Sequence, residues 1–148
     1  MYFEELELGM TWQTPPVTIE KEKVLDFARL YDNIPLHTDE EYAKTTHFGG
    51  LIAPGVMTFM SVWVQFLNMG ILGPEFLAGK STHMEWRKPV YPGDTLTGKV
   101  TVTRLERRNA KNGLVEVTVD IFNQRGELVT QDWTEAVIKC AGYRRLPS

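Results

Sequence analysis

The apolar residues of the chain recur with a helical period in its first half and alternate with polar residues in its second half. In the segment TIEKEKVLDFARLYD, residues 18–32, the apolar side chains lie at intervals close to one helical turn, at Ile19, Val24, Phe27, Ala28 and Tyr31. This spacing gathers apolar side chains on one face of a helix. We therefore predict an amphipathic helix over residues 18–32.

A more apolar segment, VMTFMSVWVQFLNMG, runs from Val56 to Gly70. Apolar side chains occupy nearly every face of it, which is typical of a helix surrounded by protein. A membrane span needs about 20 apolar residues, whereas this segment is shorter and includes Ser61, Gln65 and Asn68. Gly70 is suited to end the helix because glycine adopts the left-handed conformation at little cost. The sequence thus predicts a buried central helix and no membrane association.

After residue 80 the pattern becomes that of strands, rich in Thr, Val and aromatic residues. Alternation is clearest at Val115, Val117, Val119 and Ile121. Turn sequences containing glycine separate the apolar runs, at residues 91–94, 111–113 and 124–126. We predict antiparallel strands within residues 81–90, 94–108, 113–124 and 127–140.

Together these patterns predict an α+β fold in which one long buried helix is wrapped by a strongly curved antiparallel sheet, with smaller helices before the central one. The length of 148 residues and the hydrophobic content of 43% fit one domain spanning residues 1–148.

Charge and cysteine content narrow the class of protein. A net charge of -3 and a pI of about 5.6 argue against nucleic acid as a partner, because binding phosphate requires a dense basic surface. Cys140 is the only cysteine and cannot form an internal disulfide, and the acidic N-terminal sequence MYFEELELGM does not resemble a secretion signal. We expect a cytoplasmic protein.

Candidate chemistry begins with Asp32 and His37, which flank Pro35. A purely structural interpretation exists for both residues. Thr38 and Glu41 have the spacing of a capping box, His37 would then pack on Tyr42 as a hydrophobic staple, and Asp32 would form a turn. The alternative is a catalytic carboxylate and imidazole pair.

Gly55 lies immediately before the buried helix, in the segment FGGLIAPG. The first N–H groups of a helix have no intrahelical acceptor, and the helix dipole is positive there. The Gly55 N–H could therefore stabilise a carbonyl oxygen that develops negative charge. A tight turn after Pro54 is the alternative interpretation.

Other chemistries have weaker support. His37, His47 and His83 have no zinc-site spacing, so no metal is expected. Cys140 fits a small buried hydrophobe, and Ser61 lacks the GxSxG elbow of serine hydrolases. Basic side chains could meet the phosphates of coenzyme A, although surface solubility explains them more simply; they are Arg87, Lys88, Arg104, Arg107, Arg108 and Lys111.

Asp32, Pro35 and His37, followed by DEEYAKTTHFGGLIAPG and by KPVYPGDTL at residues 88–96, resemble the MaoC-like dehydratases, which include R-specific enoyl-CoA hydratases. The resemblance runs from the first predicted helix to the last strand. It implies the hot-dog fold, which agrees with the periodicity, and a homodimer or higher homo-oligomer. The chain departs from the family at Tyr31, where hydratases often have glycine, and at Ile34, where many relatives have Asn or Gln. Trp63 stands where some hydratases have serine.

The resemblance also implies an activity, namely a lyase of fatty acid metabolism that adds water across the 2,3 double bond of an enoyl thioester or eliminates it. Asp32 and His37 would activate the water and the Gly55 N–H would polarise the thioester carbonyl, with no cofactor. The substrate would be an acyl-CoA or acyl-carrier thioester. Two alternatives are a hot-dog thioesterase, which usually has a carboxylate on or near the central helix, and a noncatalytic acyl-thioester binder.

Overall fold

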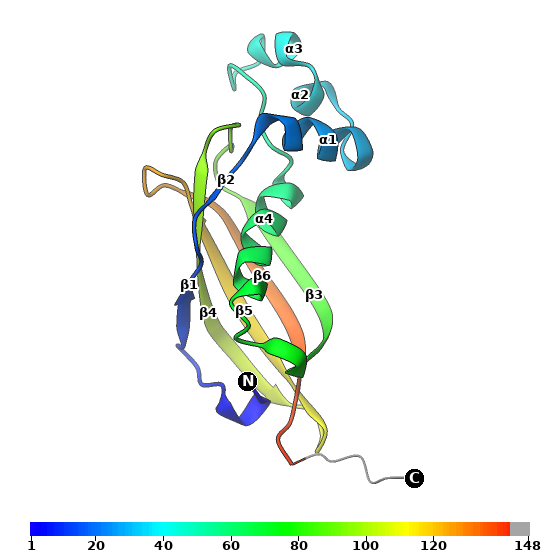
Figure 1. Cartoon of the computed structure of the whole chain (residues 1–148), viewed down its shortest axis with the longest axis vertical. Helices are drawn as coiled ribbons and strands as arrows, with labels where there is room; N and C mark the ends of the chain where they lie inside the picture. The colour runs from blue at the N-terminus through cyan, green and yellow to red at the C-terminus, as the bar shows by residue number, and fades with distance from the viewer. Residues whose placement is uncertain (143–148) are drawn as a thin grey trace.

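A curved antiparallel sheet wraps one long helix in the computed structural model, which describes residues 1–142 (Figure 1). The helix is α4, Gly55–Asn68. The long strands all follow it in the chain and are β3 (Phe76–Trp86), β4 (Thr95–Arg107), β5 (Asn112–Phe122) and β6 (Leu128–Lys139). The predicted arrangement of helix and sheet is therefore confirmed.

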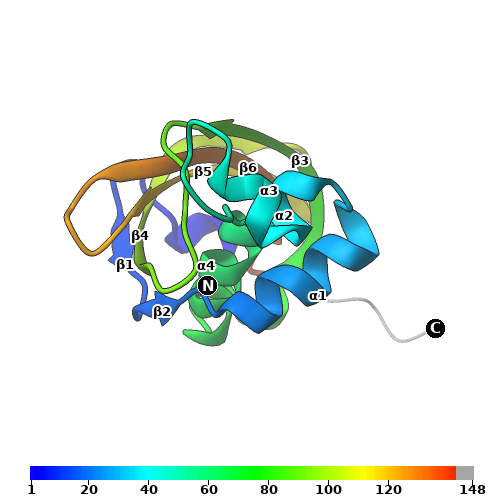
Figure 2. The same cartoon turned by 90° about the horizontal axis from the view of Figure 1, so that it is seen from above.

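The strand order is β1-β4-β5-β6-β3, with antiparallel pairing throughout. The sequence did not predict β1 (Thr11–Gln13) or β2 (Val17–Thr18), which both pair with β4. At the opposite edge, β3 pairs with β6. Seen from above, the sheet curves around α4 (Figure 2).

The core lies between the concave face of the sheet and α4. Alternate residues of β5 are buried as predicted, namely Val115, Val117, Val119 and Ile121. From α4 they meet Phe59, Val62, Trp63 and Phe66. Removing one such large side chain from water stabilises the fold by about 1.5–3 kcal/mol. These contacts hold α4 against the concave face of the sheet.

The predicted boundaries of α4 are nearly correct. The helix was expected over residues 56–70 and spans Gly55–Asn68, with Met69 as its C-cap. Gly70 has a φ of 71° and ends the segment in the left-handed conformation expected for it. Within the described residues 1–142, no helix is both long enough and apolar enough to cross a membrane.

Small helices gather at one end of the sheet, before α4 (Figures 1 and 2). They are α1 (Lys21–Tyr31), α2 (Pro35–Thr38) and α3 (Glu40–Lys44); single 3-10 turns also occur at Phe3–Glu5 and Gly73–Glu75. The predicted helix over residues 18–32 was too long at its start, because Val17 and Thr18 pair with β4 and the helix begins at Lys21.

Two other local predictions were wrong. Asp39, and not Thr38, caps α3: its Oδ1 accepts from the Tyr42 N–H at 3.0 Å, whereas the Thr38 hydroxyl donates to the Ile34 carbonyl within α2. The turn expected at residues 111–113 comes earlier, because β5 already begins at Asn112. The turns at residues 91–94 and 124–126 are confirmed by backbone hydrogen bonds from Asp94 to Tyr91 and from Gly126 to Asn123. One domain over residues 1–148 stays a prediction; residues 143–148 lie outside the described part.

Candidate active site

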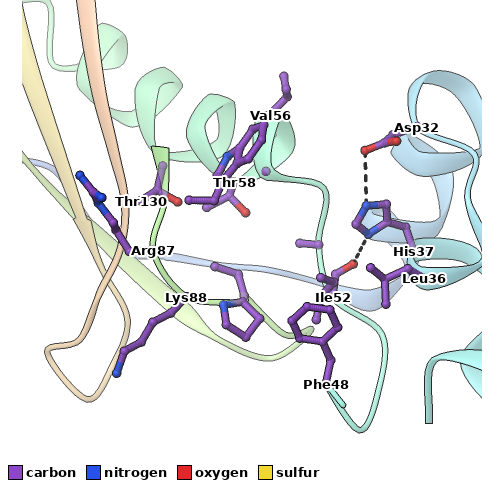
Figure 3. A pocket seen from close by; sticks show the side chains of 15 residues that line it. Asp32, Leu36, His37, Phe48, Ile52, Val56, Thr58, Arg87, Lys88 and Thr130 are labelled. Carbon is purple, nitrogen blue, oxygen red and sulfur yellow. Dashed lines mark hydrogen bonds and ion pairs between the residues drawn. The ribbon is translucent and has the colours of Figure 1, made fainter. Parts of the chain in front are cut away.

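Asp32 and His37 are placed by the junction between α1 and α2. Asp32 is the C-cap of α1, with its N–H donating to the Ala28 carbonyl at 2.9 Å. Pro35 occupies the first turn of α2, where its fixed φ suits a helix start and its missing N–H is not needed. His37 follows within that single turn and projects back toward Asp32 (Figure 3).

The two side chains lie next to each other, with His37 Nε2 at 3.4 Å from Asp32 Oδ2. On the other side of the ring, His37 Nδ1 is 2.6 Å from the carbonyl oxygen of Ile52. A carbonyl oxygen can only accept, so Nδ1 carries a proton and donates it. Nε2 is therefore the ring nitrogen that faces Asp32 and is available for proton transfer.

Burial differs between the two partners. The His37 side chain is 8% exposed and the Asp32 side chain 45% exposed. The imidazole is thus held by its surroundings, while the carboxylate keeps contact with solvent. The staple interpretation of His37 is wrong, because the ring bonds Ile52 and faces Asp32, and Tyr42 is half exposed on α3.

Both residues line a pocket of about 380 Å³ between the small helices, the start of α4 and the loop after β3 (Figure 3). Its lining also includes Gly55, which the sequence assigned to the same site. Most of the remaining walls are apolar; they are formed by Leu36, Phe48, Ile52, Ala53, Val56, Trp86, Pro89 and Val90, together with Thr58, Thr130, Arg87 and Lys88. The structure therefore brings together all three sequence-predicted site residues.

Gly55 is the first residue of α4, so its N–H has no acceptor within the helix. Trp86, at the end of β3, packs against it: a Cβ atom at residue 55 would lie 2.0 Å from Trp86 Nε1. A side chain at this position would therefore have to displace the Trp86 ring.

Of the basic residues considered for phosphate contacts, Arg87 and Lys88 lie at the pocket. Arg87 donates to Glu85 and Gln131, and Lys88 donates to Glu127 at 2.5 Å. Arg107 instead pairs with Glu4 near the chain start.

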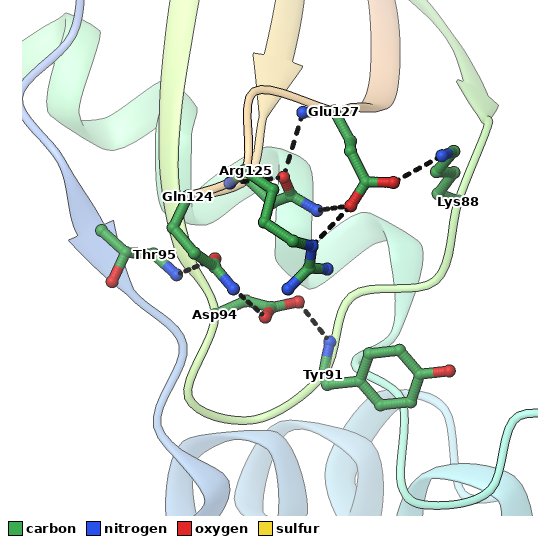
Figure 4. A network of polar contacts seen from close by, with 8 residues as sticks. Lys88, Tyr91, Asp94, Thr95, Gln124, Arg125 and Glu127 are labelled. Atoms are coloured by element: carbon green, nitrogen blue, oxygen red, sulfur yellow. Dashed lines mark hydrogen bonds and ion pairs between the residues drawn. The ribbon is translucent and has the colours of Figure 1, made fainter.

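Glu127 organises a polar network beside the pocket (Figure 4). It accepts from Lys88, Asn123 and Arg125, and these hydrogen bonds lower the pKa of its carboxyl to about 2. Asp94 continues the network by accepting from the Tyr91 N–H and from Gln124. The network joins the turn before β4 to the turn before β6 and so supports the loop that carries Lys88.

The departures from the family pattern have defined places. Ile34 is the N-cap of α2, and its carbonyl accepts from the His37 N–H and the Thr38 hydroxyl. Tyr31 is exposed and packs on Phe27. Trp63 is buried in the core, stacked on Phe59.

The remaining candidates lie outside the pocket. Ser61 donates to the Met57 carbonyl at 2.7 Å. Cys140 is buried as expected, and desolvation raises the pKa of its thiol. The His47 ring contacts the Phe48 ring in a tilted arrangement, and His83 lies on β3. Residues 1–142 contain no group of three or more His, Cys, Asp and Glu side chains able to hold a metal ion.

Sequence reasoning missed three parts of the site. The Ile52 carbonyl carries no side-chain signal. Trp86 lies far from Gly55 in the sequence. Thr58 lies within the apolar run of the central helix and does not stand out there. Its spacing of three residues from Gly55, which places both residues on one face of the helix, is the signal that could have identified it.

A long helix wrapped by an antiparallel sheet, with a pocket lined by Asp32, His37 and Gly55 at the helix start, is the arrangement of a hot-dog protein. The chain matches the MaoC like domain over residues 4–124 and belongs to that family.

Individual proteins are similar to this chain in sequence or in structure. The chain is 29% identical to the uncharacterized protein YdeM of Bacillus subtilis over 94% of this chain and 99% of that one. It is 35% identical to an (R)-specific enoyl-CoA hydratase of Rhodospirillum rubrum, over 70% of this chain and 71% of the relative. A crystal structure of a MaoC-like dehydratase from Rhodospirillum rubrum superposes with a TM-score of 0.88 at 28% identity, covering 99% of each chain. The hot-dog fold is confirmed.

Proposed function

We propose that the protein adds water across the 2,3 double bond of an enoyl thioester, or eliminates water to form that bond. The observation that carries this proposal is the position of His37. Its Nδ1 is held by the Ile52 carbonyl, while Nε2 lies 3.4 Å from Asp32 Oδ2. The side chains of Asp32 and His37 line the same pocket as Gly55, the first residue of α4.

The pair can hold one water between an acceptor oxygen and a ring nitrogen. One group takes a proton from the water as the water oxygen bonds to C3, and the other group helps that proton pass to C2, so that one molecule of water is added in all. During this step the electrons of the double bond move toward the thioester carbonyl. The Gly55 N–H at the helix N-terminus stabilises the negative charge that develops on the carbonyl oxygen. This chemistry needs no cofactor.

The hydratase named among the relatives supports the reaction class, and the mostly apolar pocket walls suit an acyl group. We propose an acyl-CoA or acyl-carrier thioester as substrate and the cytoplasm as the compartment. The thioesterase alternative has less support, because the segment Gly55–Asn68 contains no Asp or Glu. A noncatalytic binder would use the same pocket without turnover.

We further propose that two copies pair through β3 and α4. The strand β3 has only β6 as a neighbour among the described residues, and most of its side chains are exposed. Beside it, α4 presents an apolar stripe at helical spacing, formed by Val56, Met60, Val64 and Leu67, each between 42% and 50% exposed. An unpaired strand edge beside an apolar helix face is suited to pairing with another chain.

The direct test is to follow the conjugated enoyl absorbance of a short and a medium trans-2-enoyl-CoA together with a thiol reagent. Loss of absorbance without free thiol supports hydration. Thiol release supports the thioesterase, and binding without either signal supports the noncatalytic alternative.

A further inference from the structure

Thr58 has a buried hydroxyl that the protein itself does not use. The residue is 1% exposed, and its Oγ1 has no hydrogen-bond partner among the described residues. Buried hydroxyl groups are nearly always paired. In helices, threonine and serine commonly donate to the carbonyl four residues earlier. Ser61 does this on the same helix, with the Met57 carbonyl at 2.7 Å, so the unpaired state of Thr58 stands out within α4 itself.

The position of this hydroxyl relates it to Gly55. Residues three apart on a helix lie on one face, so Thr58 follows Gly55 along the side of α4 that faces the pocket. Thr58 is one of the residues that line the pocket, and Figure 3 shows its oxygen among the side chains drawn there. The pocket lining also includes Ala53, Pro89 and Val90, whose side chains have no polar atom.

We propose that the Thr58 hydroxyl is a second donor to the thioester carbonyl oxygen, beside the Gly55 N–H. This inference rests on the proposed function, because it assumes that the acyl thioester occupies the pocket. A carbonyl oxygen has two lone pairs and can accept from both donors at once. As the oxygen gains negative charge, a donor already fixed in a water-poor site stabilises it without reorganisation. The otherwise unpaired hydroxyl then finds its partner in the substrate.

The test compares Thr58→Val, which keeps the branched shape and removes the hydroxyl, with Thr58→Ser, which keeps the hydroxyl. Ser61→Ala is the matched control, since it removes a hydroxyl from the same helix that is already satisfied within it. We expect kcat of Thr58→Val to fall by about a hundredfold with KM changed little, Thr58→Ser to recover most of that loss, and Ser61→Ala to match wild type. The melting temperature of Thr58→Val should not fall, because it loses no protein hydrogen bond.

A second measurement does not depend on turnover. The infrared carbonyl stretch of bound butyryl-CoA, isotope-labelled at the carbonyl carbon, should lie at a higher frequency in Thr58→Val than in wild type and Thr58→Ser. Equal kcat and equal stretch in all variants would overturn the role of Thr58 while leaving the hydratase proposal intact. A wild type that does not hydrate enoyl-CoA but shows the stretch difference would overturn the hydratase proposal and keep the Thr58 contact. Failure of wild type to bind butyryl-CoA would overturn the Thr58 inference as well.

Discussion

The indole ring of Trp86 occupies the space that a side chain on Gly55 would need, and a Cβ atom there would lie 2.0 Å from Nε1 and 2.1 Å from Cε2. Residue 55 begins the central helix and residue 86 ends the strand at the edge of the sheet. The glycine therefore has two roles: it admits the tryptophan, and in the proposed reaction its N–H meets the thioester.

Gly55→Ala should push the indole away from α4. Overpacking of this kind costs about 1–3 kcal/mol in the free energy of unfolding. Because Trp86 is 59% exposed, its ring has room to move outward. We therefore expect a loss of unfolding free energy at the lower end of that range, together with a change in tryptophan fluorescence. Thermal unfolding of Gly55→Ala, Trp86→Leu and the double variant measures the effect. If the clash is the cause, the double variant is more stable than the sum of the single losses predicts; strict additivity would contradict it.

Asp132 is fully buried in β6, where its Oδ1 accepts from the Thr134 hydroxyl at 2.5 Å and its Oδ2 accepts from the Thr82 hydroxyl. Desolvation raises the pKa of this carboxyl above its ordinary value of 3.8, and the two hydroxyl donors offset part of that rise. A carboxyl whose pKa is higher in the folded than in the unfolded state favours folding at low pH, and this contribution is lost as pH rises through the folded-state pKa.

Asp132→Asn carries no titrating group, so its stability relative to wild type should improve as pH rises from about 4 to about 8. Urea unfolding of both proteins across that range tests the prediction. If the difference in stability between the two proteins does not change with pH, titration of Asp132 is not the source of the pH dependence.

Glu127 should have the opposite pH dependence. Its pKa is lowered from 4.5 to about 2 by Lys88, Asn123 and Arg125, so its contribution is present above 4.5 and is lost as pH falls toward the folded-state value. Glu127→Gln should therefore be less stable than wild type near neutral pH and approach it as pH falls from 4.5 to about 2. Melting temperatures between these limits measure the difference. A difference in melting temperature that is the same at all pH values would contradict a stabilising role of the ionised Glu127 carboxylate.

The proposed association of two chains predicts that a charge on the apolar stripe of α4 prevents it. Val64→Glu places a carboxylate on a residue that is 43% exposed in the single chain, and burying that charge between two copies costs several kcal/mol. Sedimentation should give a mass twice 16.9 kDa for wild type and 16.9 kDa for the variant. Leu30→Glu on α1, 74% exposed, is the matched control and should keep the wild-type mass. A wild type that sediments as a single chain would contradict the pairing.

The periodic parts of the fold were predictable because burial determines them. The alternation at Val115, Val117, Val119 and Ile121 follows from one face of β5 meeting the core, and the apolar run of α4 follows from its position inside the sheet. The strands β1 and β2 are too short to show a period, so only their pairing with β4 defines them.

The details of the site depended on competition between neighbouring residues. Threonine and aspartate are both good helix caps. Pro35 starts a separate turn that includes Thr38, so Asp39 is the residue that caps α3. The proximity of Asp32 and His37 was anticipated from the family resemblance. The Ile52 carbonyl and the Trp86 ring were not, because the first is a backbone atom and the second comes from a distant strand.

The central claim is that Asp32 and His37 activate water together, and the most direct test is the rate of trans-2-enoyl-CoA hydration by wild type, Asp32→Asn and His37→Gln. Asp26→Asn, an exposed carboxylate on α1, serves as the control. We predict that kcat falls by about 10²–10⁴-fold in both site variants while each keeps a cooperative unfolding transition, and that the control retains the wild-type rate. Wild-type rates in either folded site variant would contradict the claim.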